Sequence, residues 1–415
     1  MMRRNTKKMT MCIVIGLLMV SLFSGCGKKK ENVTLSVWGA EEDQEMLREM
    51  VDAFEEKYKD EAEFNITICA ENEVTCKETV LIDPKNAADI YTFVDDQFSS
   101  LCQNNALLEI TENVDEIIEA NGGKESAAVQ SASYDGKLYA YPMTASNGYF
   151  LYYNKEYFTE EDVKSFDKML EIAKENGKKI AMDFTSGWYL YSFFKGAGLN
   201  IELSEDGLTH ICDWNTTEGK YKGIDVAEAM CKIVANKGFL NCGDVDFVAG
   251  AKDGSIIAGI NGAWNAQNML ESYGDNYAAT KLPEYTIAGD SVQMHSFIGY
   301  KLVGVNAYTN NVKWAQRLAE WITNEENQMI RFERKGDCPS NVNAASSKKV
   351  IDSPAIAALA AQSEYAHIQR VLDSFWMPVY VYGSTITAGN LDEKSLQVLL
   401  DQMVKEITAL PEENK

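Results

Sequence analysis

The chain alternates strand-like and helix-like segments from residue 33 onward, and this order restricts its fold more than any other feature. Residues 33–38 alternate apolar and polar side chains, which is typical of a half-buried strand. Apolar side chains then recur at helical spacing in 41–58, and strand-like alternation returns at Phe64, Ile66 and Ile68. A strand, a helix and a strand in this order predict a βαβ unit, whose two strands run parallel and are joined by a right-handed crossover.

The same alternation continues along the chain in two series, the second starting near residue 148. Further strands are expected at 88–93, 148–153, 179–183 and 255–260, a hairpin around Asp-Gly at 134–140, and helices at 163–176, 188–195, 223–236, 312–323, 353–362 and 394–410. The 415 residues are too many for one ordinary core, and no low-complexity linker separates the series. We therefore expect two α/β domains between which the chain crosses more than once.

The first 25 residues have the pattern of a secretory signal. Four basic side chains come first, the apolar run 11–23 follows, and the small pair Ser24-Gly25 precedes Cys26. The apolar run is shorter than the roughly 20 residues that a membrane-spanning helix needs. A transmembrane anchor is the alternative to a secretory signal. A cysteine at this place resembles the lipobox of bacterial lipoproteins, in which the Cys26 thiol would carry diacylglycerol. The sequence therefore predicts export and a lipid anchor at the extracellular face of the bacterial cytoplasmic membrane, with 26–32 as the tether.

The charge of the remaining chain restricts the class of ligand. Four of the 39 basic side chains and none of the 62 acidic ones lie in 1–25, so the rest carries 35 basic and 62 acidic side chains, a net charge of −27. Such a surface makes nucleic acid a poor partner and repels anionic solutes over long range. A neutral ligand fits this charge better.

Motifs for catalysis and metal binding are largely missing. HExxH and GxSxG are absent, Ser165-x-x-Lys168 has no companion motif, and 244–246 begins like a calcium loop without its glycine and glutamate. No CxxC pair exists, and the three histidines lie far apart. We therefore expect no cofactor, no metal and no enzymatic activity, although chance pairs among 62 carboxylates leave a glycosidase open.

Six of the seven tryptophans divide into two groups, and Trp214, in a polar loop-like stretch, belongs to neither. Trp314 and Trp321 lie seven residues apart on one face of an expected helix and are assigned to the core. Four others lie at strand ends or in loop-like stretches: Trp38, Trp188, Trp264 and Trp376. Ligands of α/β domains bind beyond the carboxyl ends of strands, and an indole face suits the C–H face of a sugar ring. These four tryptophans are therefore candidates for a sugar site, with hydrophobic packing as the alternative.

Several short stretches, in order along the chain, resemble one known family. They are 35–38 with the helix end 54–58, Ala88-Asp89-Ile90, Leu107-Leu108-Glu109-Ile110, 134–142 with 152–155, Ile260-Asn261-Gly262-Ala263-Trp264, and Phe375-Trp376. Together they resemble the family 1 extracellular solute-binding proteins of carbohydrate ABC transporters, of the maltose/maltodextrin-binding type. The resemblance covers residues 33 to about 410.

The resemblance implies an α/β fold of two discontinuous Rossmann-like lobes with a hinge, the type II periplasmic-binding-protein fold. The lobes are expected at 33–145 with 303–350 and at 146–297 with 351–412, with a hinge crossover at 298–302.

The resemblance also implies a function and a set of binding residues. They are Trp38, Glu41, Glu42, Phe93, Asp96, Gln97, Asn147, Trp188, Trp264, Trp376 and Tyr380. Gln97 and Tyr380 stand where the family often has arginine, and Ser146-Asn147 where a glutamate is common. The implied function is capture of an oligosaccharide, with maltooligosaccharides as the expected sugar, by a monomer that delivers it to membrane permease subunits. A lipid-anchored glycoside hydrolase and a carbohydrate-binding surface adhesin are the alternatives.

Overall fold

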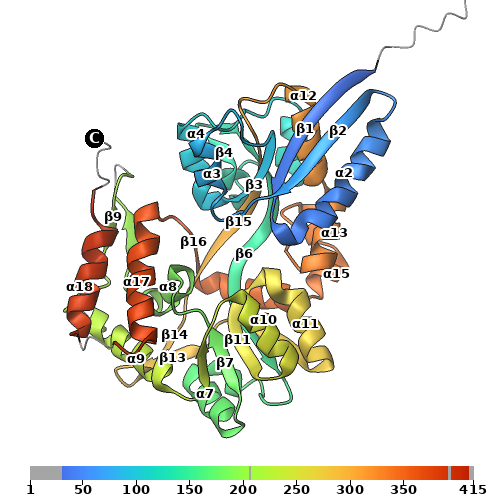
Figure 1. Ribbon diagram of the computed structural model, residues 1–415. Coiled ribbons are helices and arrows are strands. Elements are labelled where there is room, and N and C mark those ends of the chain that lie inside the picture. The colour runs from blue at the N-terminus through green and yellow to red at the C-terminus, as the bar shows by residue number, and fades with distance from the viewer. Residues whose placement is uncertain (1–29, 205–206, 391–393, 411–415) are drawn as a thin grey trace, which may run out of the picture.

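The computed structural model describes residues 30–204, 207–390 and 394–410. Cys26, the expected signal segment and the end of the last expected lobe segment at 412 lie outside the described residues. Two α/β lobes lie one above the other in Figure 1, and long strands pass from one lobe to the other. The expected α/β fold with two lobes and a hinge is confirmed.

Ten of the described strands form one sheet that runs through both lobes. Its order is β10-β7-β11-β6-β15-β3-β1-β2, with β12 also paired to β6 and β16 to β15. The bounds are β1 Glu31–Gly39, β2 Ala62–Ala70, β3 Ile90–Val94, β6 Ala140–Asn154, β7 Lys179–Met182, β10 Phe239–Asn241, β11 Ile256–Gly262, β12 Tyr277–Thr280, β15 Ser296–Val305 and β16 Ala366–Ile368. Strand β1 pairs in parallel with both β2 and β3, so the predicted βαβ unit is confirmed.

Three two-stranded sheets lie apart from the large one. They are β4 Ser133–Tyr134 with β5 Lys137–Leu138, β8 Ile201–Leu203 with β9 His210–Cys212, and β13 Glu284–Ile287 with β14 Asp290–Gln293. The first is the predicted Asp-Gly hairpin: Asp135 and Gly136 have φ of 50° and 75°. Positive φ at both turn residues matches the twist of the flanking strands, which is why this dipeptide predicts the turn.

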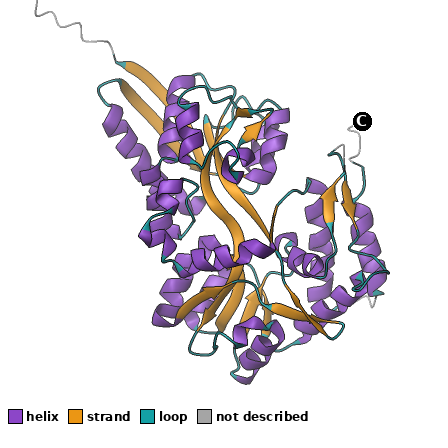
Figure 2. Ribbon diagram, turned by 180° about the vertical axis from the view of Figure 1, so that it is seen from behind, coloured by secondary structure: helices purple, strands orange, loops and turns teal. Residues whose placement is uncertain are grey.

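Strands β6 and β15 connect the lobes. They pair antiparallel with each other at the centre of the molecule (Figure 2). In the upper lobe of Figure 1, β15 also pairs with β3, and in the lower lobe β6 pairs with β11 and β12. The expected strand 148–153 is thus the second half of β6. Sequence alternation does not reveal this continuity, because the 15-residue strand leaves one core and enters the other.

Helices cover both faces of the sheet (Figure 2). In the first part of the chain and its late return they are α2 Gln44–Tyr58, α3 Cys76–Ile82, α4 Phe98–Gln103, α5 Val114–Ala120, α6 Ala127–Ser131, α12 Val312–Ile322, α13 Glu325–Lys335, α14 Val342–Ala345 and α15 Lys348–Ile351. The others are α7 Phe166–Glu175, α8 Gly187–Gly196, α9 Gly223–Ala235, α10 Asp244–Asp253, α11 Ala266–Tyr273, α16 Pro354–Gln362, α17 Trp376–Thr387 and α18 Leu396–Ile407.

Short 3-10 turns precede or follow several helices. They are η1 Glu41–Asp43, η2 Asp95–Gln97, η3 Asp162–Lys164, η4 Ala263–Asn265, η5 Gly274–Asn276, η6 Ser363–Tyr365 and η7 Asp373–Phe375. The predicted helix 41–58 is therefore η1 followed by α2. At the start of α7, the Ser165 hydroxyl accepts a hydrogen bond from the Lys168 backbone N–H, so this Ser-x-x-Lys pair forms a helix cap.

The hydrophobic cores show that residues distant in sequence build each lobe. One core, in the lobe that holds β1 and β2 (the N-lobe), draws on 33–143 and 302–322. Two further cores, in the lobe that holds β7 and β11 (the C-lobe), draw on residues between 149 and 407. Trp314 is 2% exposed in the N-lobe core, as expected, and Trp321 packs against that core. The expected lobe boundaries stay a prediction.

Candidate ligand cavity between the lobes

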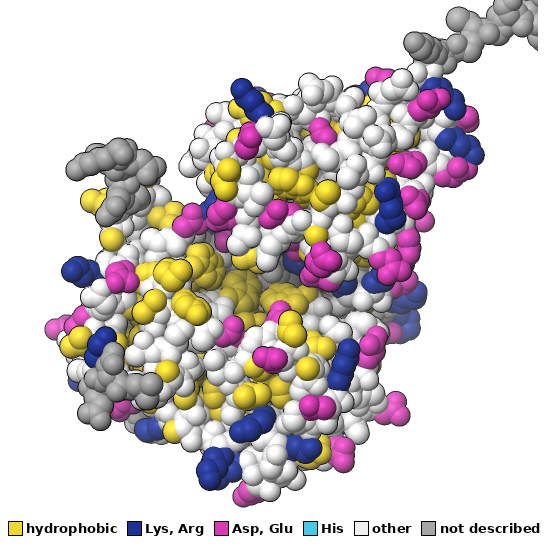
Figure 3. All heavy atoms as spheres, in the orientation of Figure 1, with side chains coloured by type: hydrophobic (Ala, Val, Ile, Leu, Met, Phe, Trp, Pro, Cys, Tyr) yellow, Lys and Arg dark blue, Asp and Glu magenta, His cyan; other side chains and the backbone are white. Residues whose placement is uncertain are grey.

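A cavity of about 490 Å³ lies between the lobes, where Figure 3 shows the molecule hollowed. The turn after β1, the segment that ends β2, the central strands, and the starts of η4 and α10 contribute to its wall. It is lined by Ala40, Glu41, Glu42, Ala70, Glu71, Asn72, Glu73, Val74, Val94, Asn147, Asp244, Trp264 and Lys301. Because both lobes contribute side chains, a ligand in this cavity would contact both at once.

The N-lobe wall is rich in carboxylates. Glu41 and Glu42 are exposed on η1, and Glu71 follows the end of β2, where its Oε1 accepts a hydrogen bond of 3.0 Å from the Thr79 hydroxyl. Among the described residues that line the cavity, Lys301 is the one cationic side chain. This wall therefore repels anions and offers hydrogen-bond acceptors to a ligand with hydroxyl groups.

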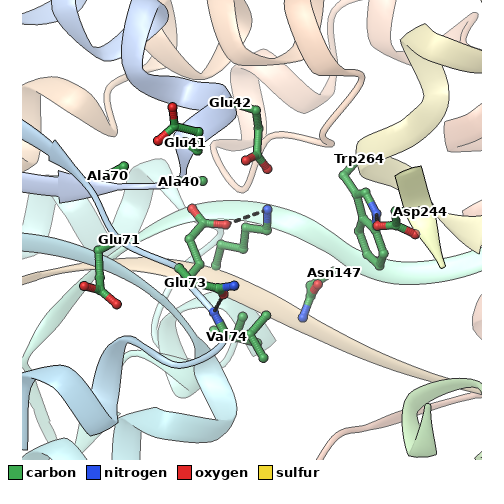
Figure 4. A pocket seen from close by; sticks show the side chains of 13 residues that line it. Ala40, Glu41, Glu42, Ala70, Glu71, Glu73, Val74, Asn147, Asp244 and Trp264 are labelled. Carbon is green, nitrogen blue, oxygen red and sulfur yellow. Dashed lines mark hydrogen bonds and ion pairs between the residues drawn. The ribbon is translucent and has the colours of Figure 1, made fainter. Parts of the chain in front are cut away.

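An ion pair lies at the bottom of this wall. The Lys301 Nζ, on β15, is 2.8 Å from a carboxylate oxygen of Glu73, and their side chains are 9% and 6% exposed (Figure 4). Burial alone lowers the pKa of Lys301, but the carboxylates of Glu73, Asp337 and Asp43 outweigh it and raise that pKa. Lys301 thus stays charged and neutralises Glu73.

A second buried ion pair fixes the turn that carries Glu41 and Glu42. Asp43, the next residue, is fully buried and accepts hydrogen bonds from Arg331 and, at 2.6 Å, from Lys335. Burial alone raises the pKa of Asp43, but Arg331, Lys335 and Lys301 outweigh it and hold that pKa well below its usual range. Helix α13, which supplies the two cations, therefore positions the acidic turn at the cavity.

The C-lobe supplies an aromatic wall. Trp264, on η4 after β11, is half-buried, and its indole N–H donates a hydrogen bond of 2.8 Å to Asp244 at the start of α10 (Figure 4). The Asn147 amide, on β6, is 7% exposed and lies between this wall and the acidic one. Indole, amide and carboxylates thus surround one space.

The other expected tryptophans of the C-lobe belong to a row of aromatic rings. Trp188 stacks on Phe297 with centroids 5.5 Å apart, Phe297 meets Phe375 at 6.3 Å, and Phe375 meets Trp376 at 5.0 Å. Both tryptophans are half-buried, and Tyr380, one turn further along α17, is 52% exposed. None of these three expected residues lines the cavity described above.

The structure places Trp38, Phe93 and Gln97, and also Asp96, outside the cavity lining. Trp38 is half-buried against the N-lobe core, and Phe93 is fully buried within it, so the Phe93 ring offers no face to a ligand. The Gln97 side chain is 3% exposed; it accepts from the Lys77 backbone N–H at 2.8 Å and donates to the Glu73 carbonyl at 2.7 Å. Gln97 therefore holds the loop behind β2 instead of facing a ligand.

Asp96 links the N-lobe to the segment that follows β16. Its carboxylate accepts a hydrogen bond of 2.9 Å from the Gln369 amide, beyond β16. Burial raises the pKa of Asp96 to about 7, in spite of the nearby Lys77 ammonium. Its placement near the hinge indicates a structural contact between segments.

The sequence did not predict four of the charged lining residues. They are Glu71, Glu73, Asp244 and Lys301. One signal existed for Lys301, because it is a single charged residue within the otherwise uncharged run 296–305. Asp244 begins the stretch 244–246 that resembles the start of a calcium loop, and no group of three or more candidate metal ligands occurs in the described part of the chain. Among the described helices, none is long and apolar enough to cross a membrane.

Comparisons with known proteins give the family. Residues 49–358 match the family described as bacterial extracellular solute-binding protein. A galactooligosaccharide-binding protein of Bacillus subtilis (strain 168) is 25% identical over 94% of this chain and 95% of its own length. A maltooligosaccharide ABC transporter solute-binding lipoprotein of Streptococcus pneumoniae (strain ATCC BAA-255 / R6) is 22% identical over 78% of this chain and 75% of its own.

Solved structures agree in fold over nearly the whole chain. A protein structure with acarbose has a TM-score of 0.78 at 30% identity and covers 92% of this chain and 99% of its own. A maltodextrin-binding protein from L. casei BL23, without ligand, has a TM-score of 0.73 at 25% identity and covers 91% and 99%. Since the family match spans most of the described residues, this chain belongs to the bacterial extracellular solute-binding proteins.

Proposed function

We propose that this protein is an extracellular, lipid-anchored solute-binding protein that captures an oligosaccharide and delivers it to the permease subunits of an ABC transporter. The observation that carries the proposal is the cavity between the lobes, where the Trp264 indole faces a wall of carboxylates and the Asn147 amide. An indole accepts the C–H face of a pyranose, and carboxylates and amides accept and donate hydrogen bonds to its hydroxyls.

The charge of the cavity supports a neutral ligand. Among the described residues that line the cavity, the one cation is Lys301, which pairs with Glu73. Behind the wall, the Lys335 Nζ is 3.5 Å from Glu42 and 2.6 Å from Asp43. A phosphorylated or otherwise anionic sugar would be repelled. We propose a maltooligosaccharide, because the pneumococcal relatives and a structural neighbour are named for maltooligosaccharide or maltodextrin.

Binding is proposed to close the lobes about the strands that join them. The expected hinge crossover 298–302 lies within β15, whose pairing with β6 is irregular on both sides of Lys301. A sugar that contacts the lobes 33–145 with 303–350 and 146–297 with 351–412 at once would favour the closed arrangement. No bond is made or broken in this step, and the protein acts as a monomer.

The lipid anchor is proposed on Cys26, from the small pair before it and the lipoprotein relatives. Cys26→Ala is expected to leave protein that is unprocessed or released from the membrane fraction. Maturation and lipid labelling of the Cys26→Ala protein would contradict the proposal that Cys26 carries the lipid. The binding proposal would not be affected.

The binding proposal is tested with a panel of sugars and titration calorimetry. The panel holds maltooligosaccharides of increasing length, acarbose, galactooligosaccharides and a sugar phosphate, and the first class is expected to bind best. Trp264→Ala is expected to make the binding free energy less favourable by about 2 kcal/mol or more, which corresponds to a dissociation constant that is roughly 30-fold higher. Preference for galactooligosaccharides would replace the proposed sugar and keep the function.

Two results would overturn the function itself. Chromatography of each sugar after incubation should show no shortening, and hydrolysis by the purified protein would indicate a glycoside hydrolase. Sugar binding without any dependence of cellular uptake on this protein would indicate a surface adhesin.

A further inference from the structure

Asp244 accepts a hydrogen bond from the N–H at the edge of the Trp264 indole. Its carboxylate oxygens accept two hydrogen bonds of 2.8 Å, Oδ2 from the Trp264 indole N–H and Oδ1 from the Asn261 amide. Asn261, at the end of β11, is 4% exposed, and its own oxygen accepts from the Gly262 backbone N–H and the Asn265 amide. Helix α10, strand β11 and η4 thus meet in one hydrogen-bond network that ends at the indole.

The Gly262 backbone packs closely against the same ring. A Cβ atom placed on Gly262 would lie 2.0 Å from two carbons of the six-membered ring of Trp264, so any larger residue would push the ring away. The Gly262 backbone thus lies against one side of the ring. The Asp244 carboxylate accepts a hydrogen bond at its N–H edge, and Trp264 lines the cavity (Figure 4). These two contacts restrict the orientation of the ring in the absence of a ligand.

We propose that Asp244 is a positioning residue that presents the Trp264 indole to the ligand, and that it acts through the indole N–H. The proposal rests on the proposed function for its effect on affinity. A free indole would lose rotational freedom when a sugar stacks on it, and that loss weakens binding. An indole already held by Asp244 and Gly262 loses less.

The test is a double-mutant cycle between Asp244 and Trp264. Trp264→Phe keeps an aromatic ring but removes the N–H that Asp244 accepts. Asp244→Ala alone is expected to weaken binding of the preferred maltooligosaccharide by about 3- to 10-fold, the range that corresponds to ordering one side chain. In the Trp264→Phe background, Asp244→Ala is expected to weaken binding by about twofold or less, because the hydrogen bond between the indole N–H and Asp244 is already absent.

Asp246→Ala is the matched control, because Asp246 lies in the same first turn of α10, is exposed and carries the same charge. It is expected to bind like the unchanged protein. Asp244→Asn keeps one acceptor oxygen and is expected to recover part of the lost affinity. An equal loss from Asp244→Ala in both Trp264 backgrounds would overturn the proposal, because Asp244 would then act on the sugar directly.

A spectroscopic measurement without ligand separates this inference from the proposed function. Near-ultraviolet circular dichroism reports how rigidly indoles are held, and Asp244→Ala is expected to lose the same signal that Trp264→Phe removes, with little change in the melting temperature. An unchanged spectrum would overturn the positioning role. If the unchanged protein binds no sugar of the panel, the proposed function fails, and the spectrum still decides whether Asp244 orients the indole.

Discussion

Asp43 is the residue whose loss should destabilise the N-lobe most sharply through electrostatics. It is fully buried, its carboxylate is bonded to both Arg331 and Lys335, and Arg331 is itself 1% exposed. Asp43→Ala would leave the Arg331 guanidinium buried without its nearest anion. Breaking a buried pair from one side costs about 3–5 kcal/mol. Glu73 and Asp337 also stabilise the Arg331 charge, so we expect the lower end, about 3 kcal/mol.

The same pair predicts a dependence on pH. The pKa of Asp43 is lower in the folded protein than its ordinary value of 3.8, because Arg331, Lys335 and Lys301 outweigh the effect of burial. The pair therefore stabilises the fold above about pH 4 and loses its contribution as the pH falls through the folded-state pKa. The difference between the unchanged protein and Asp43→Ala should shrink in that acidic range.

Urea denaturation measures this difference without adding salt that would screen charges. Asp52→Ala is the control, because Asp52 lies on α2, the helix that follows Asp43, but pairs with Arg48 at the surface. Such exposed pairs contribute about 1 kcal/mol or less. A cost of Asp43→Ala that does not exceed that of Asp52→Ala at neutral pH would refute the argument that burial makes this pair indispensable.

Four further predictions address the core, the site and the hinge. Trp314→Ala should lower the free energy of unfolding by about 3–5 kcal/mol, because its ring packs on Phe54 and Phe64, while calorimetry finds sugar affinity unchanged in the folded fraction. Trp376 lies outside the cavity lining, and the family resemblance is what makes it a stacking residue, so Trp376→Ala is expected to weaken sugar binding by about 2 kcal/mol with little loss of stability. Unaltered affinity across the panel would remove it from the site. Burial and the stacked His367 lower the pKa of His295 to about 4, so thermal melts should show stability falling as the pH drops from about 6.5 towards 4, and His295→Gln should reduce that slope. Small-angle scattering should give a smaller radius of gyration at saturating sugar, whereas an unchanged radius would favour a rigid binding module.

The strands and helices followed from the sequence wherever a periodic pattern was buried on one side. The βαβ start, the Asp-Gly turn and the helix with Trp314 are examples, because each depends on neighbours within one or two turns. Trp264, on η4 directly after β11, could be placed at a strand end for the same reason. Local spacing contains this information, and the short motifs in their order along the chain indicated the family.

The composition of the cavity depended on the tertiary structure. Glu73 and Lys301 are 228 positions apart in the chain, and their pairing exists because β15 returns to the centre of the sheet. Phe93 shows the opposite case: all five residues of β3 are buried, and the Phe93 ring packs inside the N-lobe core. The sequence by itself determined the elements and the kind of fold, since these follow from local patterns. Only the tertiary structure decided which charges meet, which aromatic rings stay accessible and which carboxylate holds Trp264, since these depend on contacts between residues far apart along the chain.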